Sequence, residues 1–138
     1  MPPQLTAALD ALAVEASAEE FTAVESLLGG SFFRLAEIRR HPVAKINAAD
    51  LTAQEVGDWL SGLPVGQCTE LRVAWIANRV GARISLETFA ANIDDLWFPA
   101  MDDIVCVLNS GSQLMALVLD HEELITLSSV NPALDPAH

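Results

Sequence analysis

The side chains that could form a site are concentrated in residues 93–108, IDDLWFPAMDDIVCVL. Two acidic pairs, Asp94–Asp95 and Asp102–Asp103, bracket the aromatic pair Trp97–Phe98, and Pro99 interrupts regular structure between them. Aromatic anchors inside a charged rim are typical of a protein-binding hot spot, and rim carboxylates steer a basic partner toward it. One interpretation is therefore a binding site for a basic protein. Its candidate residues are Asp94, Asp95, Trp97, Phe98, Asp102 and Asp103.

The second interpretation of this stretch is structural. Trp97 and Phe98 would then fill the core where a strand begins, while the four carboxylates stay in solvent. In both interpretations the carboxylates are exposed, so replacing them with Asn is expected to leave folding nearly intact. The sequence leaves the choice between the two interpretations open.

The histidines lack the spacing that a metal site requires. His121 lies in the acidic segment DHEE, and a turn of carboxylates and histidine could hold a divalent metal. Adjacent residues in a tight turn rarely converge on one ion, however, and no second histidine stands at a recognisable spacing. We interpret DHEE as a solvated hairpin turn and His41, which precedes Pro42, as a residue at a helix C-terminus. No metal is expected.

The two cysteines, Cys68 and Cys106, have no CxxC or Cys-His spacing, so both are predicted to be reduced. Cys106 lies in an apolar strand and is expected to be an unreactive core residue. The chain also lacks the glycine-rich phosphate loops, the GxSxG nucleophile motif and the HExxH zinc motif. We therefore predict no catalytic residue and no cofactor, although an enzyme is not excluded.

The net charge of -12 makes a nucleic-acid or anionic-membrane partner improbable, because both require clustered Lys and Arg. All seven cations lie between residues 34 and 83, whereas residues 84–138 hold nine carboxylates and no cation. Either the basic middle neutralises the acidic ends within one fold, or the acidic C-terminal third faces a basic partner.

The composition indicates a folded protein in the cytoplasm. Hydrophobic residues make up 51% of the chain, which is too many for a disordered segment. No apolar run approaches the roughly 18 residues of a membrane span. The N-terminus MPPQLTAALD has no signal-peptide pattern, and two reduced cysteines suit a reducing compartment.

Helix signals dominate the first half of the chain. An apolar stripe predicts a first helix over residues 5–16, and Ser17 with Glu20 forms a capping-box pattern before a second helix that ends at Gly29–Gly30. Ser31 begins a further helix that Pro42 ends, and Thr52 with Glu55 forms another capping-box pattern.

Residues 70–83 are ambiguous. As a helix they place Val73, Ile76 and Val80 on one face and three arginines on the other; as a strand, apolar residues alternate from Leu71 to Trp75. The helical pattern explains more residues, so we predict a helix and keep the strand as the alternative. Ser85 caps a further short helix, whose C-terminal end would carry Asp94–Asp95, where negative charge is unfavourable.

The signal changes to strands after Pro99. Residues 103–128 read as a three-stranded antiparallel meander with turns near Ser110–Gly111 and His121–Glu122. The chain is thus predicted to be a single α+β domain, residues 1–138, with N-terminal helices packed on a small C-terminal antiparallel β-meander and a loose tail at 129–138.

These observations favour a small acidic cytoplasmic protein that binds another protein. It would be an antitoxin or immunity-type neutraliser of a basic effector, or an adaptor. The alternative is a small-molecule-binding protein or minor enzyme with a pocket between helices and sheet, lined by tryptophans such as Trp59 and Trp75 if these do not simply fill the core. A third hypothesis is a homodimer formed through an edge of the meander or through Leu96–Phe98.

Overall fold

The computed structural model describes residues 2–66 and 69–130, and its centre is an antiparallel sheet of six strands. The order of the strands across the sheet is β1-β6-β5-β4-β2-β3. The strands are β1 (Ala44–Asn47), β2 (Glu70–Trp75), β3 (Val80–Ser85), β4 (Ile104–Ser110), β5 (Gln113–Leu119) and β6 (Leu124–Ser129). The predicted mixed α+β class is therefore confirmed.

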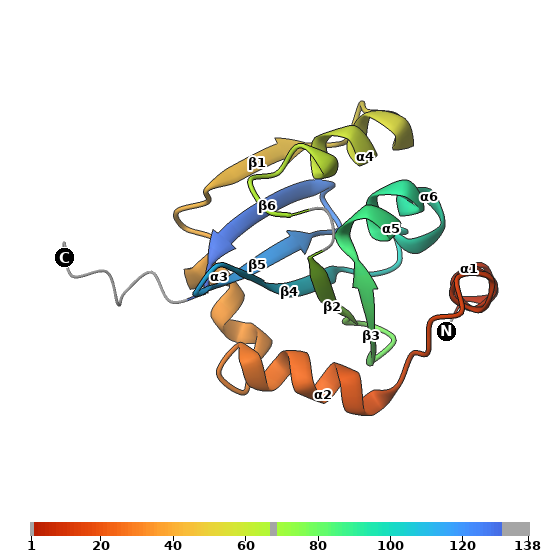
Figure 1. The fold of residues 1–138 in the computed structure, drawn as a ribbon, viewed down its shortest axis with the longest axis horizontal. Coiled ribbons are helices and arrows are strands. Elements are labelled where there is room, and N and C mark those ends of the chain that lie inside the picture. Colours follow the sequence, from red (N-terminus) through yellow and green to blue (C-terminus); the bar gives the residue numbers. More distant parts are fainter. Residues whose placement is uncertain (1, 67–68, 131–138) are drawn as a thin grey trace.

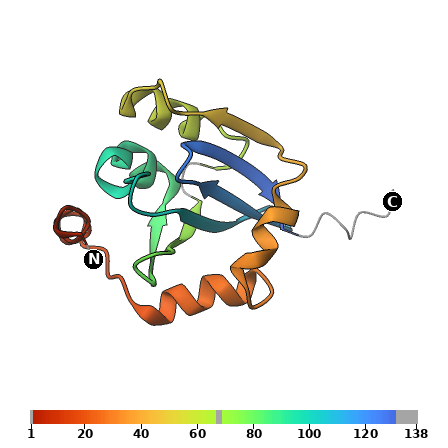
Figure 2. The ribbon, with the colours of Figure 1, turned by 180° about the vertical axis from the view of Figure 1, so that it is seen from behind.

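Helices cover both faces of the sheet, as the two opposite views in Figures 1 and 2 show. One face carries α2 (Ala18–Leu27), the 3-10 turn η1 (Phe32–Arg34) and α3 (Leu35–Ile38). The other face carries α1 (Pro3–Ala11), α4 (Ala53–Ser61), α5 (Leu86–Ala91) and α6 (Ile93–Leu96). No helix among the described residues is long and apolar enough to cross a membrane.

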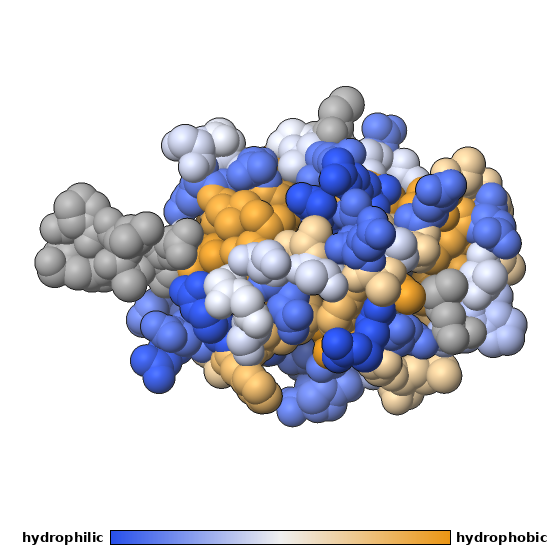
Figure 3. Space-filling view, turned by 90° about the horizontal axis from the view of Figure 1, so that it is seen from below, coloured by the Kyte–Doolittle hydropathy of each residue, from blue (hydrophilic) through white to orange (hydrophobic). Residues whose placement is uncertain are grey.

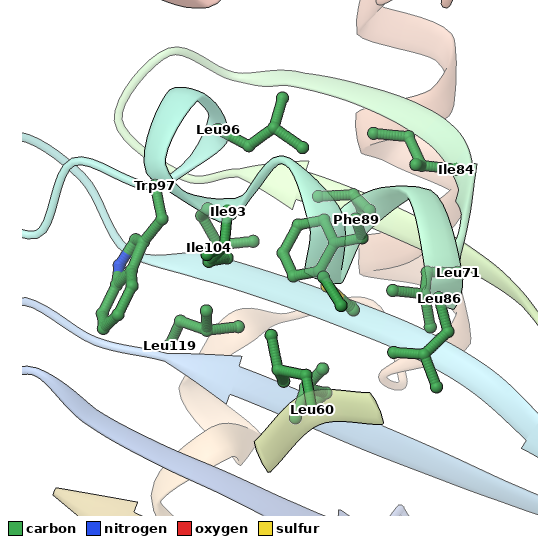
Figure 4. Close-up of a cluster of buried hydrophobic side chains, with 14 of the residues drawn as sticks. Leu60, Leu71, Ile84, Leu86, Phe89, Ile93, Leu96, Trp97, Ile104 and Leu119 are labelled. Carbon is green, nitrogen blue, oxygen red and sulfur yellow. The ribbon is translucent and has the colours of Figure 1, made fainter. Parts of the chain in front are cut away.

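Burial on both faces explains the continuous apolar run of β4. Ile104 and Cys106 pack toward α4, α5 and α6, whereas Val105 and Val107 pack toward α2. A strand that alternates between two cores has no solvent side, so its sequence shows no polar alternation. Figure 4 shows the larger core, where Phe89 and Leu60 lie between the helices and the sheet.

Most of the predicted helix starts and turns are confirmed. The side chains of Ser17, Thr52 and Ser85 each accept a backbone N–H in the first turn of α2, α4 and α5, respectively. β4, β5 and β6 form the predicted meander, with turns at 111–112 and 120–123. The first helix is shorter than predicted, since α1 ends at Ala11 and Ala13 has a φ of 56°.

The prediction of a helix over residues 70–83 was wrong. This segment forms the β2–β3 hairpin, in which Arg72 lies directly opposite Arg83. Like charges opposite each other destabilise a sheet unless a counter-charge lies between them. Glu20 of α2 supplies it, with its carboxylate 3.2 Å from Arg72 Nη2 and 3.2 Å from Arg83 Nε. Glu20 therefore does not complete the predicted capping box.

The sheet is also larger than predicted. The meander is its middle, because β1 pairs with β6 and β2 pairs with β4. Both outer strands of the meander are thus paired within the chain, and neither offers a free edge to a second copy. Residues 129 and 130, which were predicted to begin a loose tail, belong to the fold, because Ser129 ends β6 and Val130 is buried. Cys68 and residues 131–138 lie outside the described residues.

Candidate functional site

The aromatic pair of the candidate stretch contributes to the core. Trp97 is only 8% exposed, and its indole lies beside Ile93, Ile104 and Leu119 (Figure 4). Phe98 is partly buried against the same cluster, whereas the nearby Met101 is 63% exposed. Trp97 is therefore not an exposed anchor, which agrees with the structural interpretation of this pair.

Asp102 is buried, contrary to the expectation that all four carboxylates lie in solvent. It is 8% exposed. Its carboxylate accepts hydrogen bonds from the backbone N–H of Ala77 at 2.6 Å and from Asn78 Nδ2 at 2.9 Å. These donors belong to the turn of the β2–β3 hairpin. Asp102 thus fixes the hairpin turn to the start of β4, and its carboxylate is occupied within the chain.

Asp103 is also occupied within the chain. It accepts a hydrogen bond from the backbone N–H of His121 at 2.7 Å, and its carboxylate lies 3.1 Å from His121 Nδ1. This hydrogen bond raises the pKa of His121 above its usual value. The DHEE segment is the predicted hairpin turn, and the described residues contain no group of His, Cys, Asp and Glu that could hold a metal.

Asp94 and Asp95 differ from the other acidic pair, because both are exposed and neither side chain has a partner among the described residues. They lie in the first turn of α6, not at the C-terminal end of the preceding helix as predicted, so their charge is favourable to the helix dipole. Of the six candidate residues, these two alone combine exposure with an unoccupied carboxylate.

Asp94 also borders a groove between α4 and α5. The two helices approach closely at Gly57, where an added Cβ would lie 2.7 Å from the carbonyl oxygen of Ala90. Small residues at this crossing leave a groove of about 410 Å³ on the surface. Asp58, Glu87 and Asp94 lie along it, and no Lys or Arg lines it.

The acidic residues of α1, α4, α5 and α6 form what we call the acidic helical face. All six are exposed, and none forms an ion pair within the described part of the chain. The four helices carry no Lys or Arg. The six residues are Asp10, Glu55, Asp58, Glu87, Asp94 and Asp95.

The side of the molecule over α2 is chemically mixed, as hydrophilic and hydrophobic residues alternate across it in Figure 3. Arg39 and Arg79 contact neighbouring groups of the chain. Arg39 binds Asp120 at 2.8 Å. Burial raises the pKa of the Asp120 carboxyl, but the hydrogen bonds from Arg39 and from the backbone of Leu124 and Glu122 lower it by more, so the net pKa is below its usual value. The Arg79 guanidinium lies 5.1 Å from the centre of the Phe21 ring.

A smaller hollow of about 150 Å³ opens between α4, α6 and the 120–123 turn, and we call it the Trp97 hollow. Its apolar wall includes Leu51, Val56, Trp97 and Pro99. Two carboxylate residues also line it: Asp94 and Glu123. The Trp97 Nε1 nitrogen is buried without a hydrogen-bond partner.

Sequence reasoning missed Asp58, Glu87 and Glu123 because each belongs to a different local motif. Asp58 is an ordinary exposed helix position, and Glu87 lies in the first turn of a capped helix. Only the packing of α4 on α5 places them along one groove. A comparison with known protein families, curated proteins and solved structures finds no match for this chain.

Proposed function

We propose that this protein binds a basic partner protein through the acidic helical face, as a cytoplasmic adaptor or as a neutraliser of a basic effector. The observation that carries the proposal is the exposure of six carboxylates, without any Lys or Arg, on the four helices of one face. Such a surface attracts basic proteins and accelerates their association.

The rest of the chain supports this proposal because its arginines do not neutralise the face. Arg39 pairs with Asp120, and Arg72 and Arg83 both pair with Glu20. These three arginines are therefore engaged by carboxylates outside the acidic helical face. A second copy of the chain is an unfavourable occupant of this face, since two uniformly acidic surfaces repel each other.

The contributions of the candidate residues differ. Asp94 and Asp95 would contact the partner, while Asp102 and Asp103 add to the field but have their carboxylates engaged within the chain. Trp97 and Phe98 support the surface from below. Fully buried side chains such as Leu60 and Phe89 fill the space between α4, α5 and the sheet, so a ligand pocket at that place is not favoured (Figure 4).

The proposal can be tested with two variants of equal net charge. The face variant carries Glu87→Gln, Asp94→Asn and Asp95→Asn. The control variant neutralises three carboxylates on or beside α2 and α3: Glu19→Gln, Glu25→Gln and Glu37→Gln. Each is immobilised, partners are captured at low salt, and captured proteins are compared by mass spectrometry and then titrated over a range of ionic strengths.

The face variant is expected to lose a basic protein that the wild type and the control variant both retain. Binding of that protein to the wild type should weaken steeply with salt, because exposed charges are screened within about 8–10 Å at physiological ionic strength. Equal losses in both variants would show that net charge alone matters. Full binding by the face variant would refute the proposal.

A further inference from the structure

The end of α1 departs from what its own sequence favours. The apolar stripe predicts one helix over residues 5–16, but α1 ends at Ala11. Residues 12–16, with the sequence LAVEA, contain no Gly or Pro, and Leu, Ala and Glu are among the best helix-forming residues. The local sequence therefore does not account for the break, and contacts elsewhere in the fold must maintain it.

The break places Ala13 in a strained backbone conformation. Its φ is 56°, in the left-handed region, which is unfavourable for a residue with a Cβ atom. The Ala13 N–H donates to the carbonyl oxygen of Asp10 at 3.1 Å. The next N–H, that of Val14, donates to the carbonyl oxygen of Leu9 at 2.9 Å. This is the Schellman motif, in which Ala13 occupies the position that glycine usually takes.

Tertiary contacts oppose this local preference for a helix. Val14 and Ala16 are partly buried against the larger core, so they stabilise the extended path of the connector. Ser17 forms two backbone hydrogen bonds with Gly81, each 2.9 Å long, and fixes the start of α2 to the sheet. A conflict between local preference and packing favours a second conformation of the segment that carries it, and here that segment is residues 12–16.

The main neighbour of α1 is α6. Figures 1 and 2 show α1 at the margin of the molecule beside α6, joined to α2 by a connector without helical structure. Leu5 and Leu9 of α1 are only 1% and 2% exposed, so α1 cannot leave α6 without exposing both side chains. A second copy of the chain offers an identical surface that would bury them again.

We propose that two copies of this chain form a dimer by exchanging α1. In the exchanged dimer, residues 12–16 continue α1 as a helix, Ala13 leaves the left-handed region, and α1 packs on α6 of the other copy. The contact between α1 and α6 is the same in both forms, so the connector decides their relative stability. Asp10 is the one charged residue of α1, and the exchange does not press two acidic faces together.

The connector also sets the protein concentration at which the dimer forms. A short connector holds α1 near its own α6 at an effective concentration in the millimolar range. A second copy competes as the protein concentration approaches that range. Relief of strain at Ala13 in each copy favours the dimer, whereas lost burial of Val14 and Ala16 opposes it. We expect the dimer to be populated at about 0.1–1 mM.

The test compares the wild type with glycine variants at two exposed alanines. Ala13→Gly removes the strain of the broken connector and disfavours its helical form. Ala7→Gly is the matched control, because position 7 is helical in both forms. Each protein is unfolded in urea and refolded at about 1 mM. Dimer and monomer are then measured over a dilution series by size-exclusion chromatography with light scattering.

The wild type and Ala7→Gly are expected to form dimers with dissociation constants within about threefold of each other. Ala13→Gly should raise the dissociation constant at least tenfold, because each of the two connectors loses its preference for the helix. Higher salt should strengthen the dimer by screening the repulsion between two acidic copies. A basic partner would show the opposite response to salt.

The exchange itself is identified by refolding ¹³C-labelled and unlabelled wild type together. Isotope-filtered NOE spectra of the dimer should show contacts between α1 of one copy and α6 of the other. A wild type that stays monomeric at about 1 mM would overturn the proposal. So would a dimer in which α1 and α6 of the same copy remain in contact, or equal weakening by both glycine variants. None of these results bears on the acidic helical face, which its own variants test.

Discussion

Asp102→Asn is expected to destabilise the fold by about 2 kcal/mol, although the same change at Asp94 should have almost no effect. The Asp102 carboxylate accepts the backbone N–H of Ala77 at 2.6 Å and Asn78 Nδ2 at 2.9 Å, and the Asn78 backbone N–H lies at 3.4 Å. Asn at position 102 keeps one acceptor and turns an NH₂ group toward the other donors. Hydrogen bonds to charged groups contribute about 1.5–3 kcal/mol each. The substitution removes one of these bonds and leaves the other with a neutral acceptor, so the expected loss of stability is about 2 kcal/mol.

The assay is urea denaturation at neutral pH, with Asp94→Asn as the exposed control. Asp94→Asn should stay within about 0.5 kcal/mol of the wild type. Because Asp102 and Asn78 are partners, adding Asn78→Ala to Asp102→Asn should cost less than the sum of the single changes by about 1 kcal/mol. A stability of Asp102→Asn equal to that of Asp94→Asn would refute this account of the hairpin turn.

Three further predictions follow from buried groups. Trp75→Phe should cost about 1–2 kcal/mol more in urea denaturation than Trp97→Phe, because only Trp75 loses a hydrogen bond; equal costs would mean that the Trp97 donor has a partner. Arg39 contributes to the lowered pKa of Asp120 in the folded protein. This difference between the folded and unfolded states stabilises the fold at pH values above the pKa of the unfolded carboxyl, and the stabilisation is lost as the pH falls through the pKa of the folded state. Asp120→Asn should therefore flatten the acid side of a plot of melting temperature against pH, and an unchanged slope would contradict the pairing. Burial raises the pKa of the Cys106 thiol, so native labelling by a thiol reagent, measured with the other cysteine replaced by Ser, should be much slower than labelling in denaturant; rapid native labelling would contradict its burial.

Features that depend on neighbouring residues could be predicted from the sequence. The starts of α2, α4 and α5 were predictable because Ser17, Thr52 and Ser85 bond to backbone groups three residues away. The β4–β5–β6 meander was predictable because both connections carry turn residues. In each case the stabilising contact lies within a few positions of the residue that signals it.

Features that depend on distant residues could not be predicted. Arg72 and Arg83 fit one face of a helix equally well, and the carboxylate that stabilises them in a hairpin belongs to Glu20, far away in the sequence. β1 has four residues and is a strand because it pairs with β6. Neither segment contains a local sequence pattern strong enough to predict its strand without knowledge of the distant partner.

The candidate site shows the same limit. The pairs Asp94–Asp95 and Asp102–Asp103 look alike in the sequence, but the second pair is engaged by Asn78 and His121, which the sequence places far from it. The groove beside Asp94 exists because α4 crosses α5 at Gly57. A charge pattern alone therefore indicated an acidic surface but not which of its carboxylates are exposed and unoccupied.

The position of β6 has a consequence for the order in which the protein is made. β6 is the last of the described strands to leave the ribosome, yet it lies between β1 and β5, and β1 pairs with no other described strand. All four helices of the acidic helical face are synthesised before the meander on which they rest. A nascent chain that stops before Leu124 therefore has the carboxylates but an incomplete sheet beneath them, so the acidic helical face takes its final arrangement only after β6 is released.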